Sequence, residues 1–151
     1  MGNSGKIRKS GLCLTPEDYM TRREEREQAF ILLFEKSFNE ETEISELYDL
    51  ALEDEIVAES EFVKSLAFKA WENLETIDPV IEKHAKGWKL GRISKVALAV
   101  LRMAICEILY FDDIPVGVSI NAAVELCKKY AAKDDASFVN GLLGSVSKEE
   151  K

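Results

Sequence analysis

The chain has 151 residues, of which 46% are apolar and 32% are charged, and its formal net charge is −8. A chain of this length forms one ordinary domain, and its composition is typical of a globular protein rather than a disordered or membrane protein. Three cysteines without a CxxC pair and a single histidine disfavour both a disulfide framework and a zinc site, so we expect a cytoplasmic protein.

The charge is distributed unevenly along the chain. Residues 40–82 contain fourteen acidic residues against two lysines, whereas residues 83–102 contain six basic residues and no acidic one. Such an asymmetry is typical of two differently charged surfaces, although solvated helix faces that differ by chance explain it equally well.

The first nineteen residues differ from the rest of the chain. Residues 1–19 contain three glycines and a proline and show no sustained periodicity. We interpret them as a flexible leader, an extension of the natural protein, or the product of a misplaced start, because Met20 is itself a candidate first residue.

Helical patterning begins at Thr21. Thr21 and Glu24 have the spacing of a capping box, in which each side chain satisfies the other residue's backbone amide, and they predict a helix that runs to about Asn39. The apolar positions of this helix form one stripe and should leave three arginines exposed in its first turns. These arginines are Arg22, Arg23 and Arg26. Because cations at a helix N-terminus oppose the helix dipole, we expect them to have a use.

Three more helices are predicted before the middle of the chain. Apolar residues with helical spacing indicate a helix over about 43–53 and another after Ser60. Asp78 and Pro79 resemble an N-cap followed by a proline at the first helical position, so we expect the next helix to begin there.

The most apolar stretch, residues 96–111, carries only two charges and has no broad polar face. It should therefore be a central helix that other helices cover on at least two sides. Ser119 is predicted to cap the next helix, and Asp134, Asp135 or Ser137 to cap a short last one. No segment alternates with period two, so the predicted fold class is all-α, with about seven helices.

Nothing in the sequence requires catalysis. His84 stands among lysines without a group to activate it, and Cys106 and Cys127 lie inside apolar helical patterns. A binding module fits the residues better, because exposed arginines can pair with phosphates and an exposed aromatic ring can stack on an unpaired base. A helical protein-interaction domain is the equal alternative.

From Met20 to about Ser147 the chain resembles the NusB family of bacterial transcription antitermination factors. The motifs that carry the resemblance are TRREEREQAF, IDPVIEKHAKGW, VLRMAICEILYFDDIP, INAAVELCKKYA and, most specifically, FVNGLL at 138–143. The resemblance implies one RNA-binding domain over 20–151, with helical subdomains at about 20–75 and 76–147. It implies no cofactor, no metal and no membrane association.

The resemblance also implies partners and site residues. Family members pair with a small-subunit ribosomal protein, NusE, and the pair binds single-stranded boxA RNA and acts on the RNA polymerase elongation complex with other Nus factors in ribosomal RNA operons. Residues implied to bind RNA are Arg22, Arg23, Arg26, Asp134, Asp135 and the base-stacking Phe138. Residues implied to lie on the partner face are Phe34 and Ala97.

Two positions depart from the family pattern. Glu24, Glu25 and Glu27 dilute the arginine-rich segment, so phosphate contacts should be few. Ala97 stands where the family usually has an acidic residue that contacts the ribosomal protein, so either another acid substitutes or pairing is weaker. Two alternatives remain: a self-associating homologue, a dimer with weak or lost RNA binding, and a detached copy of the related domain of some rRNA methyltransferases.

Overall fold

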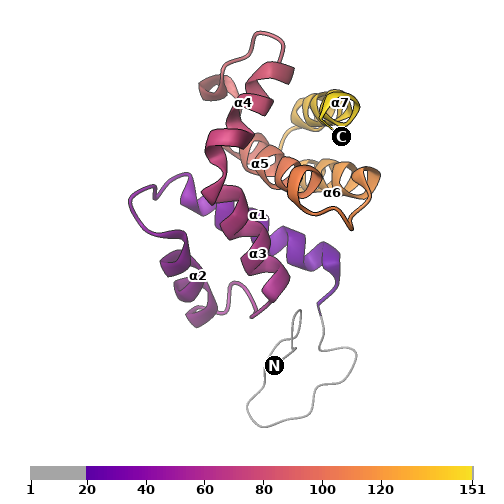
Figure 1. Ribbon diagram of the computed structural model, residues 1–151. Coiled ribbons are helices and arrows are strands. Elements are labelled where there is room, and N and C mark those ends of the chain that lie inside the picture. The colour runs from indigo at the N-terminus through magenta and orange to yellow at the C-terminus, as the bar shows by residue number, and fades with distance from the viewer. Residues whose placement is uncertain (1–19, 151) are drawn as a thin grey trace. The chain divides into compact units, whose positions relative to one another are not determined.

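A computed structural model of the protein describes residues 20–150 (Figure 1). Over that range the chain forms seven α-helices and one 3-10 helix and contains no β-strand. The helices are α1 (Arg22–Lys36), α2 (Ile44–Glu53), α3 (Glu61–Glu72), α4 (Leu74–His84), the 3-10 helix η2 (Leu90–Arg92), α5 (Lys95–Tyr110), α6 (Val116–Tyr130) and α7 (Lys133–Glu149). The predicted all-α fold is confirmed, and the predicted leader lies outside the described residues.

The chain divides into two compact units, the first ending at Phe68 and the second beginning at Lys69. The first contains α1, α2 and most of α3, and the second contains the end of α3 and all later helices. The division thus falls inside α3, whereas the sequence suggested one near residue 75. Within residues 20–150, no helix is long and apolar enough to cross a membrane.

In the first unit, α1 begins at the predicted capping box. The Thr21 hydroxyl accepts a hydrogen bond from the Glu24 amide at 3.1 Å, and the Glu24 carboxylate accepts one from the Thr21 amide at 2.8 Å. Two amides that the start of a helix leaves without partners are thereby satisfied. The helix packs against α2 and ends at Lys36, three residues before the predicted end.

In the second unit, α5 is the central helix, as the sequence predicted. Eleven of its sixteen residues are buried, and it packs against α4, α6 and α7 (Figure 1). Leu101, Met103 and Ile105 are completely buried, and burying one such side chain contributes about 1.5–3 kcal/mol to folding. The Ser94 hydroxyl caps the helix by accepting a hydrogen bond from the Ala97 amide at 3.1 Å.

The predicted start of α4 is wrong. The helix begins at Leu74, and Pro79 lies inside it, where the proline has no amide hydrogen to donate. Asp78 is not an N-cap, because its carboxylate accepts two hydrogen bonds, both of 2.9 Å, from the Arg102 guanidinium of α5. This bidentate pair and the burial of Ile77 and Ile81 favour a helix that continues through the proline.

The predicted caps of the last two helices are also wrong. Helix α6 begins at Val116, so Ser119 lies inside it and donates a hydrogen bond of 2.6 Å to the buried carboxylate of Glu107. Helix α7 begins at Lys133 and runs to Glu149, without a side-chain cap and longer than predicted. In both cases the polar residue that resembled a cap is part of the first turns, where tertiary contacts or the helix dipole favour it.

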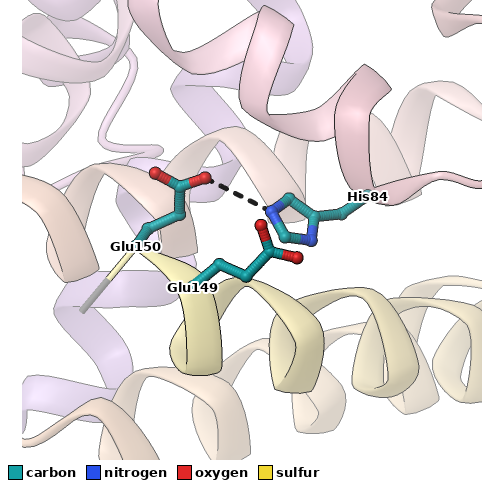
Figure 2. A group of neighbouring side chains, drawn as sticks. All are labelled: His84, Glu149 and Glu150. Carbon is teal, nitrogen blue, oxygen red and sulfur yellow. Dashed lines mark hydrogen bonds and ion pairs between the residues drawn. The ribbon is translucent and has the colours of Figure 1, made fainter.

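The end of α7 is tied to α4 by a polar cluster that consists of Lys83, His84, Glu149 and Glu150. Figure 2 shows the last three of these side chains. The His84 Nε2 atom lies 3.3 Å from the Glu150 carboxylate, and its Nδ1 atom lies 2.7 Å from the Ser145 hydroxyl. The Lys83 ammonium lies 3.2 Å from Glu149 and 3.5 Å from Glu150. These contacts hold together the two helices that flank the candidate site described below.

Removing the Asp78 carboxylate should destabilise the second unit. In Asp78→Ala the Arg102 side chain, which is only 12% exposed, would lose its bidentate partner. We expect the free energy of unfolding to fall by about 2 kcal/mol, less than for a fully buried ion pair. Urea unfolding followed by circular dichroism measures this. The control is Glu82→Ala, at an exposed position of α4; equal effects of the two substitutions would contradict the prediction.

The cluster at the end of α7 should make stability depend on acid pH. The pKa of Glu150 is lowered, chiefly because its carboxylate is hydrogen-bonded to His84. The stabilisation that the ionised Glu150 carboxylate gives the folded state is therefore fully present above the ordinary pKa of 4.5. It is lost as the pH falls through the lowered pKa of the folded state.

Replacing Glu150 tests that dependence. Glu150→Gln should lower Tm at pH 7 by at most about 3 °C, because its charged partner Lys83 is exposed and solvent screens the pair. The Tm difference from the unmodified protein should shrink below pH 4.5. Thermal unfolding at several pH values measures both effects, and a difference that is independent of pH would exclude this carboxylate as the cause.

Candidate nucleic-acid interface

The candidate phosphate-binding arginines lie in the first two turns of α1 but differ in their surroundings. The Arg22 side chain is 56% exposed, lies 2.8 Å from the Glu25 carboxylate, and places its guanidinium 4.0 Å from the centre of the Phe62 ring. An arginine has five N–H donors, so this ion pair leaves donors available for a phosphate. The contacts with Glu25 and Phe62 fix the direction in which Arg22 points.

Glu25 is a buried carboxylate that links two helices, and not an exposed charge of the arginine-rich segment. It is only 3% exposed, and its second carboxylate oxygen accepts a hydrogen bond of 2.7 Å from the Ser60 hydroxyl. The same Ser60 hydroxyl accepts a hydrogen bond from the Val63 amide at the start of α3. The carboxylate therefore joins the start of α1 to the start of α3, a role that the sequence analysis missed.

The expectation that all three arginines are exposed is wrong for Arg26. Arg26 is only 6% exposed, and its guanidinium lies 5.7 Å from the centre of the Phe62 ring. Arg23, in contrast, is exposed. Of the predicted cluster, Arg22 and Arg23 are thus accessible to a ligand, whereas Arg26 packs within the first unit.

In the second unit, the candidate base-stacking ring of Phe138 is half-buried near the start of α7. Its neighbour is Trp88, whose ring centre lies 6.2 Å away with the two planes inclined by 59°. A surface cleft of about 300 Å³ adjoins both rings, with His84, Lys86 and Ser137 among its lining residues. The structure therefore adds Trp88, which the sequence analysis did not single out, to the candidate site.

The two candidate aspartates lie in the first turn of α7, where the helix dipole favours negative charge. Asp134 is exposed, whereas Asp135 is half-buried and accepts a hydrogen bond of 3.0 Å from the Ser94 hydroxyl. Ser94 is also the N-cap of α5, so Asp135 reaches the start of that helix through this hydroxyl. A carboxylate is thus present at the start of α5, although Ala97 itself is completely buried.

The other candidate partner residue, Phe34, is half-buried on α1. Its ring lies between those of Phe30 and Phe38, with ring centres 5.9 Å and 5.1 Å away. Phe38 is 60% exposed. Aromatic rings spaced four residues apart, two on α1 and the third in the turn that follows it, thus run from the core of the first unit to its surface, an arrangement suited to contact with another protein.

Within residues 20–150, the cysteines and the single histidine are engaged in the fold. Burial raises the pKa of the Cys106 thiol to about 12 and that of Cys127 to about 11, so both stay protonated and unreactive. His84, Glu149 and Glu150 place three potential metal ligands within 4.8 Å of one another (Figure 2). The Lys83 ammonium lies against both carboxylates and already supplies a positive charge there.

Comparison with known proteins extends these observations. The sequence of residues 23–148 matches the protein-family model of the NusB family. The chain is 47% identical to the transcription antitermination protein NusB of Ruminiclostridium cellulolyticum, over 85% of this chain and 90% of that protein.

Two solved structures are similar over most of the chain. The first is NusB of T. maritima, with a TM-score of 0.78 and 31% identity over 86% of this chain and 92% of that chain. The second is a chain from a complex of the antitermination factors NusB and NusE with dsRNA, with a TM-score of 0.76 and 28% identity over 84% and 96% of the two chains. The family match, the level of identity and the shared fold agree, and the chain belongs to the NusB family.

Proposed function

We propose that this protein is a transcription antitermination factor that binds boxA-type RNA together with the ribosomal protein NusE and acts with RNA polymerase and other Nus factors in ribosomal RNA operons. The observation that carries the proposal is membership of the NusB family, combined with likeness to a structure that contains NusB, NusE and RNA. Such a protein acts in the cytoplasm by binding and needs no catalytic chemistry of its own.

The proposed RNA contacts divide into phosphate and base contacts. Arg22 and Arg23 are exposed on the first unit and can pair with phosphates, and Phe138 presents a ring on the second unit that can stack on an unpaired base. Asp134, exposed beside Phe138 in α7, can accept hydrogen bonds from the edge of a base. We assign Arg26 a supporting role, because it is buried against Phe62.

The proposed NusE contacts lie on both units. On the first unit we propose Phe34 together with the exposed ring of Phe38. On the second we propose the start of α5, where Asp135 offers the carboxylate that Ala97 lacks. In gel filtration with light scattering, a stable dimer that binds no RNA even with NusE present would instead support a self-associating homologue.

Removing the ring of Phe138 should weaken RNA binding without changing its salt dependence. Loss of one stacked base costs about 1–3 kcal/mol, which is about a 5- to 150-fold loss of affinity. We expect Phe138→Ala to show this loss in gel shifts with boxA-like RNA and NusE. The control is Tyr130→Ala, another exposed aromatic residue of the second unit, and equal affinity of the two variants would contradict the stacking role.

Arg23 and Arg26 should respond differently to replacement. Arg23→Ala should reduce the magnitude of the slope of log affinity against log salt by about 0.7, because one phosphate contact to a single strand is lost. Its Tm should not change, since the residue is exposed. Arg26→Ala should lower Tm, because a buried side chain is removed. Titrations at several salt concentrations and thermal unfolding distinguish the two, and the reverse result would invalidate the assignment.

A further inference from the structure

Trp88 is an exposed tryptophan that a tight turn holds at the surface. Trp88 is 53% exposed, and its backbone amide donates a hydrogen bond of 3.2 Å to the Ala85 carbonyl. The two central residues of this turn, Lys86 and Gly87, have positive φ angles of 49° and 96°. A φ of 96° is readily accessible only to glycine, so Gly87 fixes the turn that presents Trp88.

Three cations surround this ring. Lys86, Lys89 and Arg92 are exposed and line, with Gly87 and Trp88, a surface cleft of about 410 Å³. None of the three forms an ion pair with any residue between 20 and 150, whereas Lys83 and Arg102, at the two ends of the acid-free segment, are paired with carboxylates. The cleft therefore carries an uncompensated positive charge next to an exposed aromatic face.

We propose that Trp88 with Lys86, Lys89 and Arg92 forms a second RNA subsite, which takes the nucleotide next to the one stacked on Phe138. The inference rests on the proposed function and extends it by assigning a separate ring and separate cations. An exposed aromatic ring together with unpaired cations suits single-stranded RNA, whose bases stack on rings while its phosphates pair with cations.

The geometry of the two rings decides how bases are placed. Stacked bases lie about 3.4 Å apart, so a base held between two rings needs them parallel and about 7 Å apart. The rings of Trp88 and Phe138 are 6.2 Å apart and inclined by 59°, which excludes a base between them. Each ring must therefore take its own base, and the RNA backbone must bend between the two.

The cations fix the side on which the backbone runs. Lys86 lines the cleft beside Phe138 as well as the cleft beside Trp88, so it lies where the two proposed nucleotides meet. Lys89 and Arg92 line only the second cleft. The phosphate between the two bases should accordingly contact Lys86, and the following phosphates should contact Lys89 and Arg92.

The first experiment measures the affinity of the full chain with NusE for boxA-like RNA. We expect Trp88→Ala to weaken binding at least about fivefold, Trp88→Phe to retain most of the affinity, and Tyr130→Ala to have no effect. The salt slope should be unchanged in Trp88→Ala. It should lose about 2 in magnitude when Lys86, Lys89 and Arg92 are all replaced by glutamine, since three phosphate contacts disappear.

A matched pair of glycine variants tests the turn without altering the ring. Gly87→Ala should weaken RNA binding as Trp88→Ala does, because alanine is strained at a φ of 96° and the turn must shift. Gly91→Ala is the control, since its added Cβ would meet nothing within 4 Å and its φ is not positive. Circular dichroism confirms that both variants are folded.

RNAs with a single abasic nucleotide locate the two bases. At one RNA position, an abasic nucleotide should make Trp88→Ala bind as well as the unmodified protein. At the neighbouring position, an abasic nucleotide should do the same for Phe138→Ala. If Trp88→Ala binds RNA normally while Phe138→Ala does not, the subsite is wrong and the proposed function stands. If neither substitution weakens binding, the subsite at Trp88 and the stacking role of Phe138 are both wrong, whereas the proposed function fails only if the unmodified chain does not bind boxA-like RNA with NusE. If Trp88→Ala weakens binding to NusE without RNA, the surface belongs to the protein partner and the inference is overturned.

Discussion

The burial of α5 is the constraint on which the second unit depends. A helix that is apolar on nearly every side must be covered by other helices, and α4, α6 and α7 all pack against it. Its two charged side chains within the core region each need a partner, since an unpaired buried charge is costly. Arg102 donates hydrogen bonds to Asp78 of α4, and Glu107 accepts one from Ser119 of α6. These pairs fix the helices on either side of α5.

The same pairs explain which parts of the fold the sequence could predict. The start of α1 was predictable because the capping box of Thr21 and Glu24 is a local interaction between residues three apart. Asp78 and Ser119 also resemble caps, but their partners lie 24 and 12 residues away in the chain. Local patterns cannot reveal such partners, and tertiary contacts decided where α4 and α6 begin.

The candidate site was predictable to a similar degree. Family resemblance indicated Phe138 and the arginines, but the sequence analysis expected Arg26 to be exposed, although it lies three and four residues before the buried Ala29 and Phe30. Trp88 has no such signal, because a tryptophan after a glycine in a connecting segment has no periodicity to classify it. Only the ring geometry, with Phe138 6.2 Å away, brings Trp88 into the candidate site.

The net charge of −8 bears on how such a protein selects RNA. An acidic protein repels a polyanion over most of its surface, so non-specific attraction is weak. The residues that oppose this repulsion are confined to short segments, of which the acid-free residues 83–102 are the most basic. On the proposed assignment of the RNA sites, phosphates would be attracted mainly where exposed rings are also available for bases. On the proposed function, affinity would therefore depend strongly on unpaired bases that can stack on the exposed rings.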